Sequence, residues 1–125
     1  MTIGFHTTVH GYPDLPRLRS ELRGWLEAGA DPEALQDLLL AVTELTTNGI
    51  EASPAGVAAI EGRKLDGTVQ LEVCDDGPGF DWTLSPEADV LRERGRGVDL
   101  VRSFVDDLTY RRVDHGTSAL ITKAL

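Results

Sequence analysis

Cysteine is almost absent from this sequence: its 125 residues include one, so the chain can form no internal disulfide. Long apolar runs are absent too, because no segment approaches the roughly 20 residues that span a membrane. The chain does not open with a basic segment followed by an apolar one, as a secretory leader does. We therefore expect a cytoplasmic protein that has no membrane partner.

Positive charge is also scarce, since 12 Lys and Arg residues stand against 21 Asp and Glu residues, for a formal net charge of −9. A general nucleic-acid binder needs a basic surface to displace counterions from the phosphates. We therefore expect no nucleic-acid partner. A partner with a basic face is compatible with this charge, and electrostatic attraction would speed its encounter with the protein.

Clusters of metal-ligating side chains are missing as well. His6, His10 and His115 are scattered without metal-ligand spacing, and we interpret them as surface or turn residues. Cys74 falls within a strand-like run, where we expect it to be a small buried hydrophobic residue.

What the chain does contain is typical of one globular domain, residues 1–125, with 41% hydrophobic and 26% charged residues. Apolar residues recur at helical spacing in two segments, each preceded by an expected N-cap aspartate, Asp14 and Asp31. A third helix is predicted at Gly97–Val105, and Asp66-Gly67 is a strong hairpin signal. The remaining periodic segments are predicted strands: Thr2–Val9, Val57–Leu65, Thr68–Cys74, Leu108–Val113 and Thr117–Ala124.

One polar stretch, Asp81–Arg96, is too long and irregular for a tight connection. Its middle, about Pro86–Arg92, is compatible with a short helix. Long loops in small domains are usually functional or mobile, so this stretch is a candidate part of a functional site.

The second helical segment carries Glu44 and Asn48, which lie four residues apart and so share one face, with about 6 Å between their Cβ atoms. The Asn48 amide oxygen can complete the shell of a Mg²⁺ ion, which prefers hard oxygen ligands. The Glu44 carboxylate can take a proton from an attacking hydroxyl. The alternative is that both are solvated residues on an amphipathic helix. The helix propensity cost of Asn48 and Gly49 favours a functional reason for their presence.

An acidic residue followed by alternating glycines closes the strand-like run at Asp75. The Asp75 carboxylate can accept the exocyclic amine of adenine, while Gly77 and Gly79 let the backbone approach a flat ring. The alternative is an ordinary turn after a strand. If the final strand lies beside this one, Thr117 in the pair Gly116-Thr117 can hydrogen-bond toward Asp75.

A glycine- and arginine-rich segment opens the third predicted helix. Free backbone N–H groups at a helix N-terminus bind phosphate, and arginine side chains can bind a terminal phosphate bidentately. The alternative is a flexible loop that leads into a helix. The segment is neither a Walker A loop nor a Rossmann fingerprint. Its candidate phosphate-binding residues are Arg94, Gly95, Arg96, Gly97 and Val98.

Taken in order, these motifs resemble those of the GHKL ATPase superfamily: Glu44-x-x-x-Asn48, Asp75-x-Gly77-x-Gly79, Gly95-x-Gly97 and Gly116-Thr117. The short length narrows the resemblance to the anti-sigma-factor serine/threonine kinase branch, the RsbW/SpoIIAB-like proteins. The resemblance to this branch depends on three sequence segments: Ala41-Val42-Thr43-Glu44-Leu45-Thr46-Thr47-Asn48, Asp75-Asp76-Gly77-Pro78-Gly79-Phe80 and Gly95-Arg96-Gly97-Val98-Asp99-Leu100-Val101. The resemblance covers nearly the whole chain.

The resemblance implies an α+β fold, a two-layer α/β sandwich in which three helices cover one face of a mixed, mostly antiparallel sheet. ATP would lie between the Glu44/Asn48 helix and the Asp81–Arg96 loop, which would act as a lid. Glu44 would be the general base, Asn48 the Mg²⁺ ligand and Asp75 the residue that reads adenine. The glycines that would shape the pocket are Gly77, Gly79, Gly95 and Gly97.

The resemblance also implies an activity and partners. Proteins of this branch phosphorylate Ser or Thr on a STAS-domain antagonist, sequester a sigma factor and work as homodimers. Glu51 and Ala52 depart from the branch, whose members often carry a basic residue and a histidine there. A non-catalytic, nucleotide-gated binding module therefore stays open as an alternative. A solitary ATP-binding half of a histidine-kinase system is less favoured, because no dimerisation helix with a phosphorylatable histidine is present.

Overall fold

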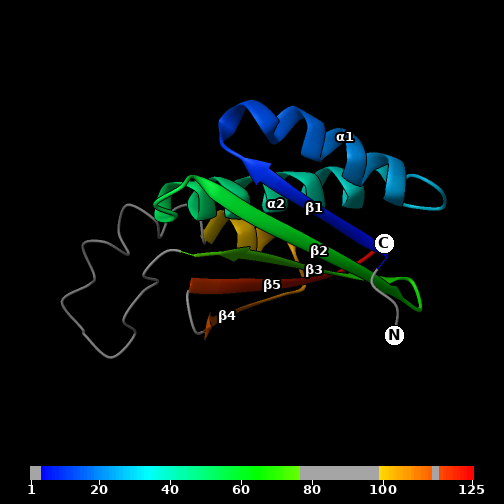
Figure 1. The fold of residues 1–125 in the computed structure, drawn as a ribbon. Coiled ribbons are helices and arrows are strands. Elements are labelled where there is room, and N and C mark those ends of the chain that lie inside the picture. Colours follow the sequence, from blue (N-terminus) through cyan, green and yellow to red (C-terminus); the bar gives the residue numbers. More distant parts are fainter. Residues whose placement is uncertain (1–3, 77–98, 114–115) are drawn as a thin grey trace.

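The computed structural model describes residues 4–76, 99–113 and 116–125, which form a five-stranded sheet with helices on one face (Figure 1). The strand order is β1-β2-β3-β5-β4, and all four pairings are antiparallel. The predicted two-layer α+β fold with a mostly antiparallel sheet is therefore confirmed. The elements are β1 (Phe5–His10), η1 (Tyr12–Asp14), α1 (Leu15–Leu26), α2 (Pro32–Ala52), β2 (Val57–Leu65), β3 (Thr68–Asp75), β4 (Asp107–Val113) and β5 (Gly116–Ala124).

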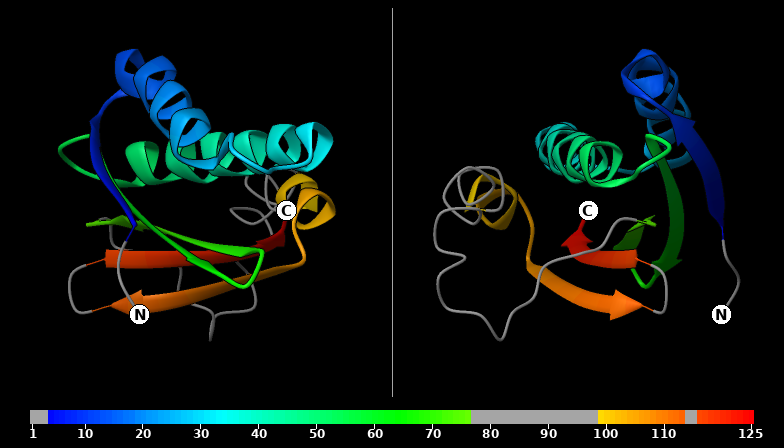
Figure 2. Two further views of the ribbon diagram at one scale, coloured as in Figure 1. Left: turned by 90° about the vertical axis from the view of Figure 1, so that its right-hand side faces the viewer. Right: turned by 60° about the vertical axis from the view of Figure 1, so that its left-hand side comes forward.

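A further helix, at residues 99–104, lies within the predicted segment Gly97–Val105, whose first two residues are outside the described ranges. Helix α2 lies between this helix and α1, and all three cover the same face of the sheet (Figure 2). Among the described residues, no helix combines the length and the apolar character that crossing a bilayer requires.

The hairpin between β2 and β3 has the predicted geometry. Asp66 and Gly67 have φ values of 50° and 79°, as the two central residues of a type I′ turn require. The turn fixes the register, with Leu65 opposite Thr68, and alternation then sends every second β3 side chain toward the helices. These inward side chains are buried, and they are Val69, Leu71 and Val73.

Helix α2 supplies the opposite side of the core. The Asp31 carboxylate accepts the Ala34 N–H at 3.0 Å, so the predicted N-cap is confirmed, and Pro32 occupies the first turn. The predicted apolar stripe of α2 is entirely buried against the sheet and α1, and it comprises Leu35, Leu38, Leu39, Val42, Leu45 and Ile50.

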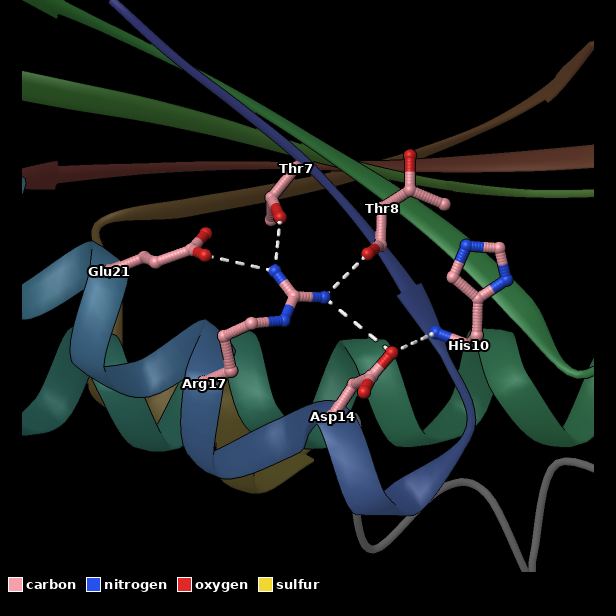
Figure 3. Close-up of polar contacts among 6 residues, drawn as sticks. All are labelled: Thr7, Thr8, His10, Asp14, Arg17 and Glu21. Carbon is pink, nitrogen blue, oxygen red and sulfur yellow. Dashed lines mark hydrogen bonds and ion pairs between the residues drawn. The ribbon is translucent and has the colours of Figure 1, made fainter.

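The predicted N-cap position of Asp14 at the start of α1 is confirmed, but the side chain does not cap the helix. Its side chain makes no cap hydrogen bond, because it accepts the His10 N–H at 2.8 Å instead (Figure 3). Arg17 of α1 donates to the Thr8 carbonyl at 2.7 Å and to Thr7 Oγ1 at 2.8 Å. Side chains at the start of α1 therefore satisfy backbone groups along the edge strand β1, which would otherwise be open to pairing with another chain.

The other edge strand, β4, has a similar contact. Arg102, from the helix at residues 99–104, donates to the Leu108 carbonyl at 3.4 Å. Each edge of the sheet thus has a backbone carbonyl bound by an arginine from a helix packed near that edge.

Cys74 lies on β3 as predicted, but its side chain is only half-buried, which corrects the expectation of a buried residue. It alternates with the inward residues, so it belongs to the sheet face that no described helix covers. Partial burial raises the pKa of the Cys74 thiol, which keeps it protonated. The expected surface positions of His6 and His10 are confirmed, while His115 lies outside the described ranges.

Gly116, at the start of β5, is set against the end of β3. A Cβ atom built on Gly116 would lie 1.7 Å from the Asp75 carbonyl oxygen and 2.8 Å from Asp76 Cα. Both contacts are to backbone, which cannot swing aside as a flexible side chain can. Glycine at this position is therefore a steric requirement of the fold at the end of β3.

We predict that Gly116→Ala lowers the free energy of unfolding by about 3 kcal/mol, because the added methyl group forces the two strands apart. Urea denaturation measures this change. Gly24→Ala is the matched control, since nothing lies within 4 Å of a Cβ at that exposed helical position. The control should gain about 0.5–1 kcal/mol of stability from helix propensity. An unfolding free energy of Gly116→Ala equal to that of the parent chain would contradict the steric requirement.

Candidate functional site

The C-terminal half of α2 approaches the sheet closely at Gly49. A Cβ atom built there would lie 3.4 Å from Ala58 Cβ, 3.5 Å from Asp75 Cβ and 3.6 Å from Asp75 Oδ2. A methyl group at this position would therefore make ordinary van der Waals contact with the Asp75 side chain, so the helix passes beside Asp75 and the glycine leaves that space open. Glycine keeps this space at a cost in helix propensity.

Asn48 precedes Gly49 on α2, and Glu44 lies one turn earlier on the same face. Both side chains are half-buried, at the margin of the buried stripe. Because Gly49 contacts Asp75, the helix brings Asn48 to the same end of the sheet as that carboxylate. The motifs around Asn48 and Asp75 therefore lie close together in the structure, although β2 separates their helix and strand along the sequence.

Thr117, on β5, lies near the same end of the sheet and forms a group with Asn48 and Asp75. It lies directly opposite Asp75 in the register of β3 and β5, so the condition for a contact between the two is met and both side chains are on the helix-covered face, although the Thr117 hydroxyl makes no hydrogen bond to Asp75. Thr117 is 7% exposed, and its hydroxyl has no hydrogen-bond partner among the described residues. A buried hydroxyl is normally hydrogen-bonded, so this one can serve a ligand bound beside Asp75.

The Thr46 hydroxyl also lacks a hydrogen-bond partner within the described part of the chain. It does not belong to the same group, because two residues along a helix correspond to a rotation of about 200°. Thr46 therefore points to the side of α2 away from Asn48.

Asp76 has a different environment from its neighbour Asp75. The hydroxyl of Ser53, the residue that follows α2, donates to Asp76 Oδ1 at 2.5 Å. Two consecutive carboxylates thus contact α2 at two points, Gly49 and Ser53. The sequence indicates that α2 ends at Ser53-Pro54-Ala55-Gly56, and the structure confirms this helix end, but no pattern in the sequence indicates that Ser53 binds Asp76.

Several predicted site residues lie outside the described residues, together with the proposed lid, Asp81–Arg96, and its possible short helix, Pro86–Arg92. Their roles stay predictions. These residues are Gly77, Gly79, Arg94, Gly95, Arg96, Gly97 and Val98.

Glu51, where the sequence departs from the resembled branch, is bound by an aromatic residue. The Tyr12 hydroxyl donates to Glu51 Oε1 at 2.9 Å across the outer surface of α2. This hydrogen bond raises the pKa of the Tyr12 phenol. The acidic side chain that replaces the usual basic one therefore has a structural partner within the chain.

The chemistry of the described group fits a purine nucleotide. A carboxylate accepts hydrogen bonds from an exocyclic amine, a hydroxyl can donate or accept, and an amide oxygen is a suitable Mg²⁺ ligand. No group of three or more His, Cys, Asp or Glu side chains is arranged to hold a metal ion in residues 4–76, 99–113 and 116–125. The role of the Asn48 amide oxygen toward Mg²⁺ stays a prediction.

A cavity of about 130 Å³ lies apart from this group, at the opposite end of β3. Gly29, Gly67 and Leu125 are among the residues that line it. It contains none of the predicted site residues.

Comparison with known sequences identifies the family of this domain. The model of the histidine kinase-like ATPase domain family matches residues 12–123. The chain is similar to the serine-protein kinase RsbW of Listeria innocua, with 27% identity over 110 residues, 77% of this chain and 69% of that protein. It is also similar to RsbW of Staphylococcus aureus, with 27% identity over 111 residues and the same coverage, 77% and 69%.

Solved structures share the fold. The RsbU and RsbW domains of Rv1364c from Mycobacterium tuberculosis match with a TM-score of 0.72 and 22% identity, over 97% of this chain and 31% of that one. The present chain thus spans about a third of that longer protein. The histidine kinase domain of the Erythrobacter litoralis EL346 blue-light activated kinase matches with a TM-score of 0.61 and 23% identity, over 90% of this chain and 60% of that one.

Because the family model spans most of the chain and the fold agrees with it, this protein belongs to the histidine kinase-like ATPase domain family.

Proposed function

We propose that this protein is an ATP-dependent serine/threonine kinase of the anti-sigma-factor type. The observation that carries the proposal is the contact between Gly49 and Asp75, which brings the Asn48 end of α2 and the acidic end of β3 together. The RsbW names of its relatives support the kinase class.

In this proposal the adenine end of the site is built on Asp75 and Thr117. The Asp75 carboxylate accepts the exocyclic amine of the base, and the buried Thr117 hydroxyl bonds a neighbouring ring atom. Guanine carries a carbonyl oxygen where adenine carries that amine, so the carboxylate would repel it. The site thereby distinguishes ATP from GTP.

The phosphate end would be formed by Asn48 and the glycine- and arginine-rich segments. Asn48 would hold Mg²⁺ through its amide oxygen, and the ion would neutralise phosphate charge. The other residues proposed for this end are Gly77, Gly79, Arg94, Gly95, Arg96, Gly97 and Val98.

Glu44 would act as the general base. Its carboxylate would take the proton of a substrate Ser or Thr hydroxyl as that oxygen forms its bond to the terminal phosphorus of ATP, whose bond to the bridging oxygen breaks to release ADP. Phosphoryl transfer depends mainly on positioning and charge neutralisation, so a base one helical turn from the Asn48 amide suits the reaction.

The partners that we propose are a STAS-domain antagonist as the phosphorylated substrate and a sigma factor as the sequestered protein, with a homodimer as the working form. The net charge of −9 favours a basic docking face on a partner.

A second candidate function is a nucleotide-gated binding module without transfer. The observation that favours it is Glu51, which replaces a basic residue and is bound by Tyr12. In this case ATP would change the affinity for a partner by shifting a conformational equilibrium. Phosphoserine on a partner after incubation with Mg-ATP, detected by mass spectrometry, would exclude this function.

We predict that Glu44→Gln keeps ATP affinity within about twofold but lowers phosphoryl transfer by about 100-fold or more, because the amide cannot accept the substrate proton. Transfer of radiolabelled phosphate to a cognate STAS protein measures the rate, and calorimetry measures the binding. An unchanged transfer rate would remove Glu44 from the mechanism.

We predict that Asp75→Asn weakens ATP binding by about 10-fold or more, as expected for loss of a charged hydrogen-bond partner. The affinity for GTP should change less, because guanine lacks the amine at that position. Calorimetric titrations with both nucleotides test this, and equal losses for ATP and GTP would refute the role of Asp75.

We predict that Gly49→Ala raises the free energy of unfolding by up to about 1 kcal/mol through helix propensity, yet lowers ATP affinity. Its methyl group would stand 3.6 Å from Asp75 Oδ2, where it displaces ligand or water from the carboxylate. Gly24→Ala in α1 is again the control, with a similar gain in stability and unchanged ATP binding. Unchanged ATP affinity in Gly49→Ala would show that the carboxylate is approached from another side.

A further inference from the structure

Ser53 joins three elements at the end of the sheet that carries Asp75. It is 7% exposed and directly follows α2, where its N–H donates to the Gly49 carbonyl at 2.9 Å. Its hydroxyl oxygen accepts the N–H of Val57, at the start of β2, at 3.1 Å. The same hydroxyl donates to Asp76 Oδ1, just after β3, at 2.5 Å.

The direction of this last hydrogen bond follows from the chemistry of the groups. A serine hydroxyl has one hydrogen, and an ionised carboxylate can only accept. The Val57 N–H already occupies a lone pair of the Ser53 oxygen, so the hydroxyl hydrogen is directed to Asp76. An O–H donor to a carboxylate at this distance is within the range of short, charge-assisted hydrogen bonds.

The link through Asp76 bears directly on Asp75. Asp75 contacts α2 at Gly49, and Asp76 is bound at Ser53, four residues later on the same helix end. Gly116 lies against the backbone of both acidic residues from the side of β5. The backbone that carries the Asp75 carboxylate is therefore paired with β2 on one side and β5 on the other, and the Ser53–Asp76 hydrogen bond joins the next residue to the end of α2.

We infer that Ser53 is a positioning residue for purine recognition: through Asp76 it fixes the Asp75 carboxylate where it accepts the amine of adenine. This inference rests on the proposed function, since it concerns how the same site selects its nucleotide. Without the Ser53 hydroxyl, the Asp76 carboxylate loses its bond to the end of α2, so Asp75, the last paired residue of β3, loses one of the contacts that hold its end of the strand. Selection of adenine over guanine then falls, because it depends on the placement of one carboxylate.

The experiment compares Mg-ATP and Mg-GTP affinities of the full chain by calorimetry. Ser53→Ala should weaken ATP binding by up to about 10-fold and lower the ratio of ATP to GTP affinity, because the worth of one hydrogen bond to a charged group is the upper limit of what a positioning residue can lose. Asp76→Ala should have the same effect. The double variant should lose no more than either single variant, because both remove one bond.

Asp76→Asn is the conservative variant that separates positioning from charge. Its amide oxygen can still accept the Ser53 hydroxyl, so ATP affinity and the nucleotide ratio should stay within about twofold of the parent values. Ser118→Ala is the matched control, since Ser118 is buried and donates to the Glu72 carboxylate at 2.8 Å on the other face of the sheet. It should lower the melting temperature without changing the nucleotide ratio.

The outcomes separate this inference from the proposed function. A parent chain that fails to bind Mg-ATP would overturn the proposed function itself. A parent chain that binds ATP, with a Ser53→Ala variant that melts earlier but keeps the parent ratio of ATP to GTP affinity, would overturn only the positioning role. If Ser53→Ala does not fold, the pair Asp76→Ala and Asp76→Asn decides the question, and equal impairment of the two would overturn the positioning role.

Discussion

The close packing of α2 on the sheet at Gly49 is the contact on which the candidate site depends. Helix α2 passes beside Asp75 at Gly49, which has no side chain. Asn48 and the Asp75 carboxylate therefore lie at the same end of the molecule. A methyl group would fit at this position with ordinary contacts, but it would fill the space beside the Asp75 carboxylate. Gly49 lowers the intrinsic stability of the helix. The buried apolar stripe along the rest of α2 offsets this loss.

The sheet around this contact restricts where a partner can approach. Arg17 and Arg102 bind backbone carbonyls along the two edge strands, so each edge has a helix side chain where another strand would otherwise pair. The face away from the helices is crossed by polar pairs, among them Arg111 and Ser118 with the Glu72 carboxylate. The group around Asp75 instead lies between the helix layer and the sheet, at the end where α2 and β3 both terminate.

The two adjacent acidic residues, Asp75 and Asp76, have different surroundings. Asp75 faces Gly49 and Thr117 on the helix-covered face, while Asp76 is bound by the Ser53 hydroxyl. The Ser53 hydroxyl thus binds Asp76, and the role in base recognition that we propose belongs to Asp75.

The order of elements, the core stripe of α2 and the Asp66-Gly67 hairpin were predictable from the sequence, whereas the pairing of Asp75 with Thr117 came from the strand order. Each depends on periodicity, on turn chemistry or on motifs that keep their order along the chain. The partner of Asp14 was not predictable, because an aspartate before a helix can bind the helix or a strand that packs beside it, and here the His10 N–H is within reach. The half-exposed position of Cys74 likewise depends on the sheet having helices on one face.

The sequence by itself determined which residues are candidates for binding and catalysis, because residue type and spacing carry that chemistry. Only the tertiary structure decided which of these residues lie close together. It also identified two further positions, Ser53 and Gly49, whose importance depends on the residues that they contact. Contacts between a helix end and a strand end depend on the packing distance between two layers, and no local pattern in the chain encodes that distance.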